Sequence, residues 1–191
     1  MTLLAFGLAT LALLLAPGPT NTLMAVAGAS HGLARVLRLL PAELAGYLTT
    51  VLPLALLGAE LLHHAPLLSL ALKLVAALWV IRLAVKLWQV PPDDGSAFRI
   101  GRGRIFTTTL LNPKALVFGL VLLPTPDPVQ LGLRLALFLA LVSLAALVWG
   151  GLGALTRASR GGAGPSAGLR RLAALWLGFV AVSLVWGALH G

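Results

Sequence analysis

The first 30 residues carry no charge, and a single stretch interrupts their apolar pattern: Ala16-Pro17-Gly18-Pro19-Thr20-Asn21. A second such stretch, Leu111-Asn112-Pro113-Lys114-Ala115, divides a later apolar run. Proline removes an amide hydrogen and clashes with the preceding turn, so each stretch predicts a kinked or unwound helix. Backbone groups freed inside a bilayer persist only where protein or a water-filled cavity satisfies them. We expect the amides of Asn21 and Asn112 to bond those groups or a ligand. Two ordinary proline kinks are the simpler alternative.

The composition around these stretches points to a lipid environment. Of the 191 residues, 59% are hydrophobic and 10% are charged, whereas a soluble domain carries about 25% charged residues. Mean hydropathy is +1.00. A soluble enzyme, a disordered chain and a nucleic-acid-binding module are therefore excluded. Cysteine is absent, so the sequence predicts neither a disulfide framework nor a thiolate metal site, and we expect no metal and no cofactor.

The apolar runs predict an all-α, polytopic membrane protein that forms one transmembrane domain over residues 1–191. A spanning helix needs about 20 mostly apolar residues. Six predicted helices meet this need, at 3–28, 41–61, 66–88, 106–124, 130–154 and 170–189. The first basic residue, Arg35, follows the first run. A cleaved signal peptide would have basic residues before that run, so we expect this helix to be retained.

The net charge of +9 lies mostly in short segments between the apolar runs. Lys and Arg gather after the first, third and fifth predicted helices and are missing after the second and fourth. Cytoplasmic loops are enriched in these residues, so we expect the odd-numbered loops in the cytoplasm and both termini outside. Arg134, near the predicted outer end of the fifth helix, is the exception.

The two interrupted helices are the first of two three-helix halves, residues 1–90 and 104–191, joined by a cytoplasmic loop. An odd number of spans per half inverts one half relative to the other. Matching Gly/Pro interruptions in such halves indicate the central binding site of a transporter. The break lies about 14 residues into the first predicted helix and about 7 into the fourth, so the match in position is imperfect.

Three segments resemble the lysine exporter and homoserine/threonine resistance family. Pro17-Gly18-Pro19 with Asn21 is similar to its first-helix motif, although Ala16 replaces a glycine and Thr20 is inserted. Residues 111–115 resemble its Asn-Pro-Lys signature, and Lys73 in ALKLVAALWVIRLAVKL matches its third-helix pattern. The resemblance covers essentially the whole chain. It implies export of amino acids or similar small zwitterions across a bacterial-type inner membrane, driven by protons or the membrane potential, and it is compatible with a homodimer.

An ionisable group at bilayer depth is costly and indicates a function by default. Lys114 follows the second break, so we expect it to hold a substrate carboxylate or to pair with an acidic group. Glu43, Gly46, Tyr47 and Thr50 share one helix face. Glu43 then carries a proton or meets the substrate's amino group; alternatively it is a carboxylate at a helix start. Lys73 is either buried or reaches the membrane surface. The predicted substrate site comprises Pro17, Gly18, Pro19, Asn21, Glu43, Tyr47, Lys73, Asn112, Pro113 and Lys114.

Alternative functions remain open. Relatives in the same superfamily move divalent metals, but four scattered histidines and no cysteine favour an amino acid as substrate. A membrane-embedded lipid-modifying enzyme would need clustered carboxylates or histidines, and a structural subunit would leave Lys114 unexplained. We therefore expect a transporter rather than an enzyme. The glycines at 150, 151, 153 and 178 predict close contacts between helices.

Overall fold

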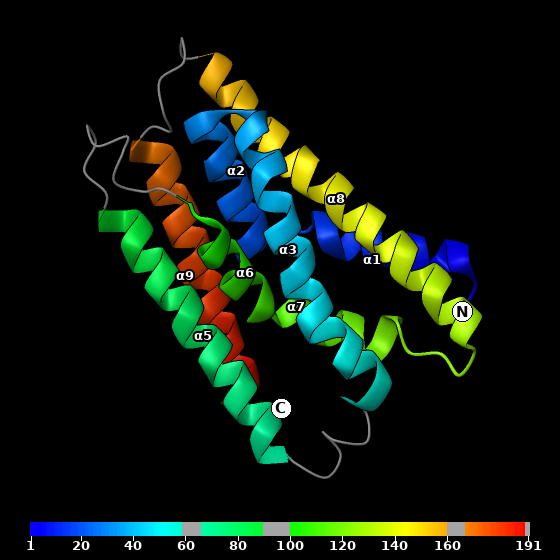
Figure 1. The fold of residues 1–191 in the computed structure, drawn as a ribbon. Helices are drawn as coiled ribbons and strands as arrows, with labels where there is room; N and C mark the ends of the chain where they lie inside the picture. The colour runs from blue at the N-terminus through cyan, green and yellow to red at the C-terminus, as the bar shows by residue number, and fades with distance from the viewer. Residues whose placement is uncertain (59–65, 90–99, 160–166, 190–191) are drawn as a thin grey trace.

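The described residues of the computed structural model, 1–58, 66–89, 100–159 and 167–189, fold into helices (Figure 1). The elements, in chain order, are α1 (Leu3–Leu15), α2 (Pro19–His31), α3 (Leu33–Pro53), the π-helical turn η1 (Leu54–Gly58), α5 (Pro66–Gln89), α6 (Arg102–Leu110), α7 (Pro113–Val117), the π-helical turn η2 (Phe118–Leu122), α8 (Pro128–Ala158) and α9 (Ala167–Leu189). The predicted all-α class is confirmed for this part of the chain.

The first predicted helix is broken where the proline stretch falls. α1 and α2 meet at an angle of 62°. Pro19 is the first residue of α2, a position at which the missing amide hydrogen costs nothing, and the extended residue Gly18 precedes it. The predicted break is thus confirmed, and α2 continues to His31 instead of ending at residue 28.

The fourth predicted helix is broken in the same way. α6 ends at Leu110, α7 begins at Pro113, and the bend between them is 49°. The side-chain oxygen of Asn112 accepts the amide hydrogen of Lys114 at 3.1 Å and so caps α7. The span begins at Arg102, earlier than the predicted residue 106, and η2 ends at Leu122.

The predicted start of the second helix at residue 41 is wrong. Gly32 has φ +74°, a left-handed conformation that ends α2 and lets α3 begin at Leu33. Pro41 lies inside α3, and the helix continues through it to Pro53. Arg35 and Arg38 consequently belong to the first turns of α3 and not to a loop.

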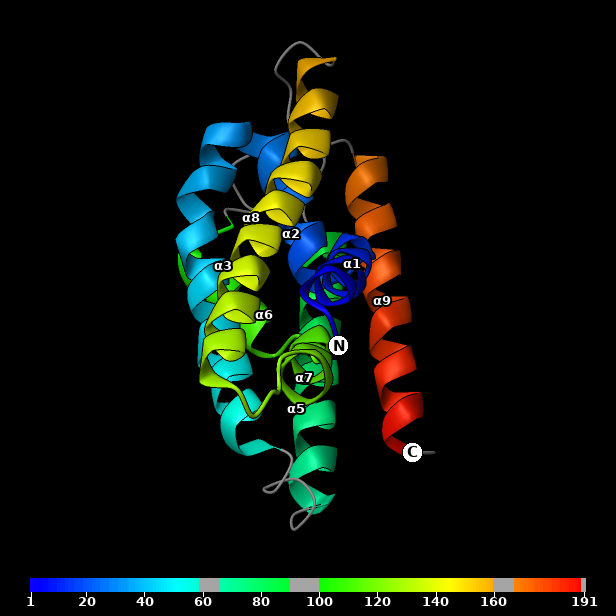
Figure 2. The same ribbon diagram turned by 90° about the vertical axis from the view of Figure 1, so that its right-hand side faces the viewer.

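The helices pack in pairs. α2 lies along α8, α5 along α9, and α3 against α6 (Figure 1). Figure 2 shows α2 and α8 between α3 and α9. A Cβ atom on Gly28 would lie 2.0 Å from the carbonyl oxygen of Gly150, and one on Gly153 would lie 1.9 Å from that of Ala25. The backbones of α2 and α8 therefore touch, as the glycines predicted. Gly151 and Gly178 have no such neighbours within 4 Å, so that part of the prediction is wrong.

Large apolar side chains cover the outside of the bundle. Leu4 is 73% exposed and Val121 68% exposed. Among the described residues, Leu33–Leu57 and Pro128–Ala158 are long and apolar enough to cross a membrane, and each bent pair of helices is a further candidate span. The chain is therefore all-helical in its described part, with two to four candidate spans and a surface suited to membrane association.

Candidate functional site

Polar residues gather where the two broken helices meet α3. They come from α2, α3, α6, the second break and α7, and all but Lys114 are buried. We call this group the polar centre; its members are Thr20, Asn21, Glu43, Tyr47, Thr109, Asn112 and Lys114. Most buried polar side chains of the described molecule belong to this group; Thr10, Thr108 and Arg134 are buried elsewhere.

Asn21 satisfies backbone groups that the first break leaves open. Its Nδ2 donates to the carbonyl oxygens of Leu14 at 2.6 Å and of Ala16 at 2.9 Å. The last carbonyls of a helix lack partners within that helix. One amide side chain thus closes the end of α1, as the prediction for freed backbone groups required.

Asn112 joins three segments of the bundle. Besides capping α7, its Nδ2 donates to Thr20 Oγ1 at 3.2 Å and to the Tyr47 hydroxyl at 3.3 Å. Thr20 Oγ1 also lies 3.3 Å from Thr109 Oγ1. The first break, the second break and α3 are consequently connected by one short hydrogen-bonded chain.

Lys114 reaches from the second break to the first. Its ammonium group donates to the carbonyl oxygen of Ala16, the same oxygen that accepts from Asn21. A Cβ atom on Gly18 would lie 3.2 Å from Lys114 Nζ, so a glycine at this position leaves room for the lysine. The hydrogen-bond partner of the Lys114 ammonium group is thus an uncharged backbone carbonyl of the other broken helix.

Glu43 lies in the middle of α3 and is 2% exposed. Its Oε2 has no hydrogen-bond partner among the described residues. Lys114 is close enough to interact with it electrostatically. The alternative of a carboxylate at a helix start is wrong, because α3 begins at Leu33. A buried carboxylate oxygen without a partner is energetically costly, so Glu43 Oε2 is suited to take up a proton or to accept a hydrogen bond from a cationic group.

The predicted shared face of Glu43, Gly46, Tyr47 and Thr50 packs against the second broken helix. A Cβ atom on Gly46 would lie 2.8 Å from Thr109 Cβ. Thr50 Oγ1 donates to the carbonyl oxygen of Leu110 at 3.1 Å. The face therefore forms the wall between α3 and the second break.

Three predicted site residues have other surroundings. Pro113 is the first residue of α7 and contributes backbone geometry. Pro17 is exposed and borders a cavity of about 400 Å³, lined mainly by apolar side chains of α2, α8 and α9. Lys73 belongs to α5, and its side chain lies outside the described part of the structure.

Sequence reasoning missed the threonines of the polar centre. Thr20 was treated as an insertion in a motif, and Thr109 received no role. Trp79 Nε1 also donates to Thr108 Oγ1 at 3.0 Å, which ties α5 to α6. The run Thr107-Thr108-Thr109 just before a break was the available signal.

Arg134 lies inside α8, near its start, as the sequence predicted, and its side chain is buried. Its side chain is 6% exposed and donates to the carbonyl oxygens of Pro124 and Met1, both at 3.0 Å. It also lies over the Phe6 ring, 5.8 Å from the centroid. Arg134 thus binds the carbonyl groups at the end of the second broken helix.

No three His, Cys, Asp or Glu side chains within the described ranges come together as a metal site would require. In comparisons with protein-family models, curated protein sequences and solved structures, no match to this chain was found.

Proposed function

We propose that this chain is a secondary-active exporter of amino acids or similar small zwitterions across a bacterial cytoplasmic membrane. The observation that supports it is the contact between the two broken helices: Lys114 of one bonds the Ala16 carbonyl of the other, beside the buried carboxylate of Glu43. Pro17, Gly18, Pro19, Asn112 and Pro113 shape the breaks that bring these groups together.

The two charges suit a zwitterion better than a simple ion. A substrate carboxylate gives Lys114 a charged acceptor in place of the Ala16 carbonyl, and charged hydrogen bonds are stronger than neutral ones. The substrate's amino group supplies a donor for Glu43 Oε2, which otherwise has none among the described residues. A simple cation gives Lys114 no new acceptor, and a simple anion gives Glu43 no donor.

The packing supports two inverted three-helix halves with six spans. In such a repeat the first broken helix corresponds to the second, α3 corresponds to α8, and α5 corresponds to α9. The contact of the first broken helix with α8 then corresponds to the contact of the second with α3, and the contact of α5 with α9 corresponds to itself. These are the pairs that pack together (Figure 1). Alternating access then moves one half against the other around the polar centre, driven by protons or the membrane potential.

The proposed orientation puts the basic end of the bundle in the cytoplasm. Arg35 and Arg38 lie in the first turns of α3, Arg102 donates to the carbonyl oxygen of Arg38, and Arg157 donates to that of Ser30 near the end of α2. These four charges therefore gather at the end of the bundle where α2 meets α3. Arg134 binds the carbonyls of both Met1 and Pro124. The N-terminus therefore lies beside the segment after η2, toward the other end of the bundle (Figure 1), which supports an N-terminus outside.

The decisive test is efflux from proteoliposomes preloaded with a mixed amino-acid pool and read by mass spectrometry. We expect the Lys114→Met variant to lose export of the transported amino acids, because the stem remains and the charge is gone. Lys86→Met, at the end of α5, is the matched control and keeps export.

Two results would overturn the proposal. Export at the wild-type rate by Lys114→Met would show that Lys114 does not bind the substrate. No loss of any amino acid from wild-type liposomes, under either a pH gradient or a potential, rejects amino-acid export itself and returns the metal exporter and the lipid-modifying enzyme as candidates.

A further inference from the structure

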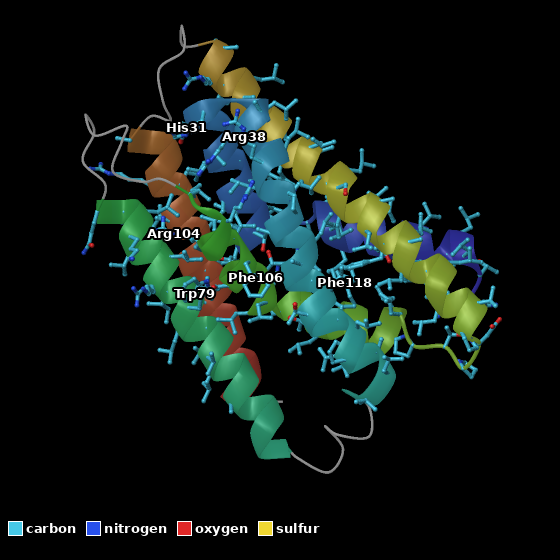
Figure 3. The ribbon with its side chains drawn as sticks, in the orientation of Figure 1. His31, Arg38, Trp79, Arg104, Phe106 and Phe118 are labelled. Carbon is cyan, nitrogen blue, oxygen red and sulfur yellow. The ribbon has the colours of Figure 1, made fainter. Side chains whose placement is uncertain are left out.

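A second polar feature lies away from the polar centre, where α2 ends and α3 begins. It is a pocket of about 390 Å³ lined by His31, Ala34, Arg35 and Arg38. Figure 3 shows His31 and Arg38 close together at this end of the bundle. We call it the basic pocket.

Arg35 of the basic pocket has a neutral hydrogen-bond partner, and the Arg38 side chain is exposed. Arg35 Nη2 donates to the carbonyl oxygen of Ile100 at 2.8 Å, which uses one of the five N–H donors of a guanidinium group. The Arg38 side chain is exposed, and its backbone carbonyl accepts from Arg102 Nε at 3.1 Å. Arg102 thereby adds a third positive charge beside the pocket.

No described carboxylate neutralises this charge. The acidic residues in the described ranges are Glu43 and Asp127. Glu43 is buried in the middle of α3, and Asp127 caps α8 by accepting from Val129 N at 2.9 Å. Clustered charge of one sign in a hollow attracts counter-ions, so the basic pocket is suited to an anion.

Two exposed apolar residues on the same face of α3 as Arg38 define what kind of anion fits. α3 is one of the candidate spans, so its first turns lie at the membrane surface. Pro41 and Ala45 are exposed and lie three and seven residues beyond Arg38, so they follow it along one helix face into the span. A soluble phosphate leaves this apolar surface without a partner, whereas a phospholipid brings acyl chains to it.

We propose that the basic pocket binds the phosphate headgroup of an anionic phospholipid, with Arg35 and Arg38 holding the phosphate and Pro41 and Ala45 contacting the acyl chains. The site is separate from the polar centre, so the proposal does not depend on amino-acid export. Basic pockets beside membrane helices are a recognised way to hold anionic headgroups.

Native mass spectrometry of the purified full-length protein tests this directly. The delipidated protein is mixed with equal amounts of phosphatidylglycerol and phosphatidylcholine that have the same acyl chains. We expect roughly tenfold more bound phosphatidylglycerol for wild type. The Arg35→Gln/Arg38→Gln variant should lose this preference, while Arg82→Gln/Lys86→Gln, which removes two charges from α5, should keep it.

Further measurements distinguish the binding of a lipid from the binding of a soluble anion. Arg38 is exposed, so Arg38→Gln alone should fold and should weaken the preference even if the double variant does not fold. Inorganic phosphate and glycerol phosphate should fail to displace the bound lipid. Equal binding of both lipids by wild type, an unchanged preference in Arg38→Gln, or displacement by inorganic phosphate would each overturn the proposal.

Discussion

At the scale of single residues, the carbonyl oxygen of Ala16 is the point at which the two broken helices meet. It accepts from Asn21, which belongs to the same helix break, and from Lys114, which lies 98 positions further along the chain. Carbonyl oxygens have two lone pairs, so both donors bind together. The geometry of one break therefore depends on a charge carried by the other.

Glu43 supports a prediction about proton coupling. Gln has the size of Glu and keeps hydrogen-bonding ability, but it cannot exchange a proton. If Glu43 carries the coupling proton, Glu43→Gln should make the export rate insensitive to pH across the range in which wild type responds. The measurement is initial efflux from proteoliposomes at a series of external pH values.

The control for this variant is Asp127→Asn, which changes an exposed carboxylate at the start of α8 and keeps a residue that can cap the helix. It should retain the wild-type pH profile. A normal profile in Glu43→Gln would exclude proton carriage by this residue and leave it the role of binding the substrate's amino group.

At the scale of helices, the pair α2 and α8 packs backbone against backbone. A methyl group on Gly153 would fall 1.9 Å from the Ala25 carbonyl oxygen, a distance that atoms in proteins do not adopt. The helices must then separate, and overpacking of this kind costs about 1–3 kcal/mol. We expect Gly153→Ala to lower the melting temperature in detergent and to slow export.

Gly151→Ala is the matched control, because a Cβ atom at that position meets nothing within 4 Å. It should melt like wild type or slightly higher, since alanine favours helix. Equal melting temperatures for the two variants would contradict the close packing of α2 on α8.

The helix breaks could be predicted from the sequence because proline acts locally. The positions of Pro19 and Pro113 and the polar residues beside them required no knowledge of packing. The start of α3 could not be predicted in the same way, since Pro41 resembled a helix start and the left-handed Gly32 was not recognised. The contact from Lys114 to Ala16 depends on how distant segments pack, and no local rule supplies it.

At the scale of the whole molecule, apolar side chains face outward and the hydrogen-bonded side chains of the breaks face inward. This arrangement is the opposite of that in a soluble protein. The composition predicted it, because so few charged residues cannot cover a water-exposed surface. The buried position of Arg134 was not predictable from its place in the run, since only the folded chain brings Met1 and Pro124 to it.

The absence of cysteine permits a clean test of orientation. Gly103 in the first turn of α6 and Pro126 between η2 and α8 are both exposed. The start of α6 and the start of α8 lie toward opposite ends of the bundle (Figure 1). We expect a thiol reagent that cannot cross membranes to label Pro126→Cys in intact cells and Gly103→Cys only after lysis. The reverse pattern would invert the proposed topology.

The shared acceptor at Ala16 has a consequence for how the site empties and refills. When a substrate carboxylate draws the Lys114 ammonium away, the Ala16 carbonyl still has Asn21 as a donor, so it is never orphaned in the bilayer. In the proposed cycle, substrate binding replaces the Ala16 carbonyl oxygen by a carboxylate oxygen as the acceptor for Lys114 Nζ, and substrate release reverses this exchange. In the proposed export cycle, Lys114 therefore returns to the Ala16 carbonyl after the substrate leaves, and the backbone of the first break keeps its hydrogen bonds throughout.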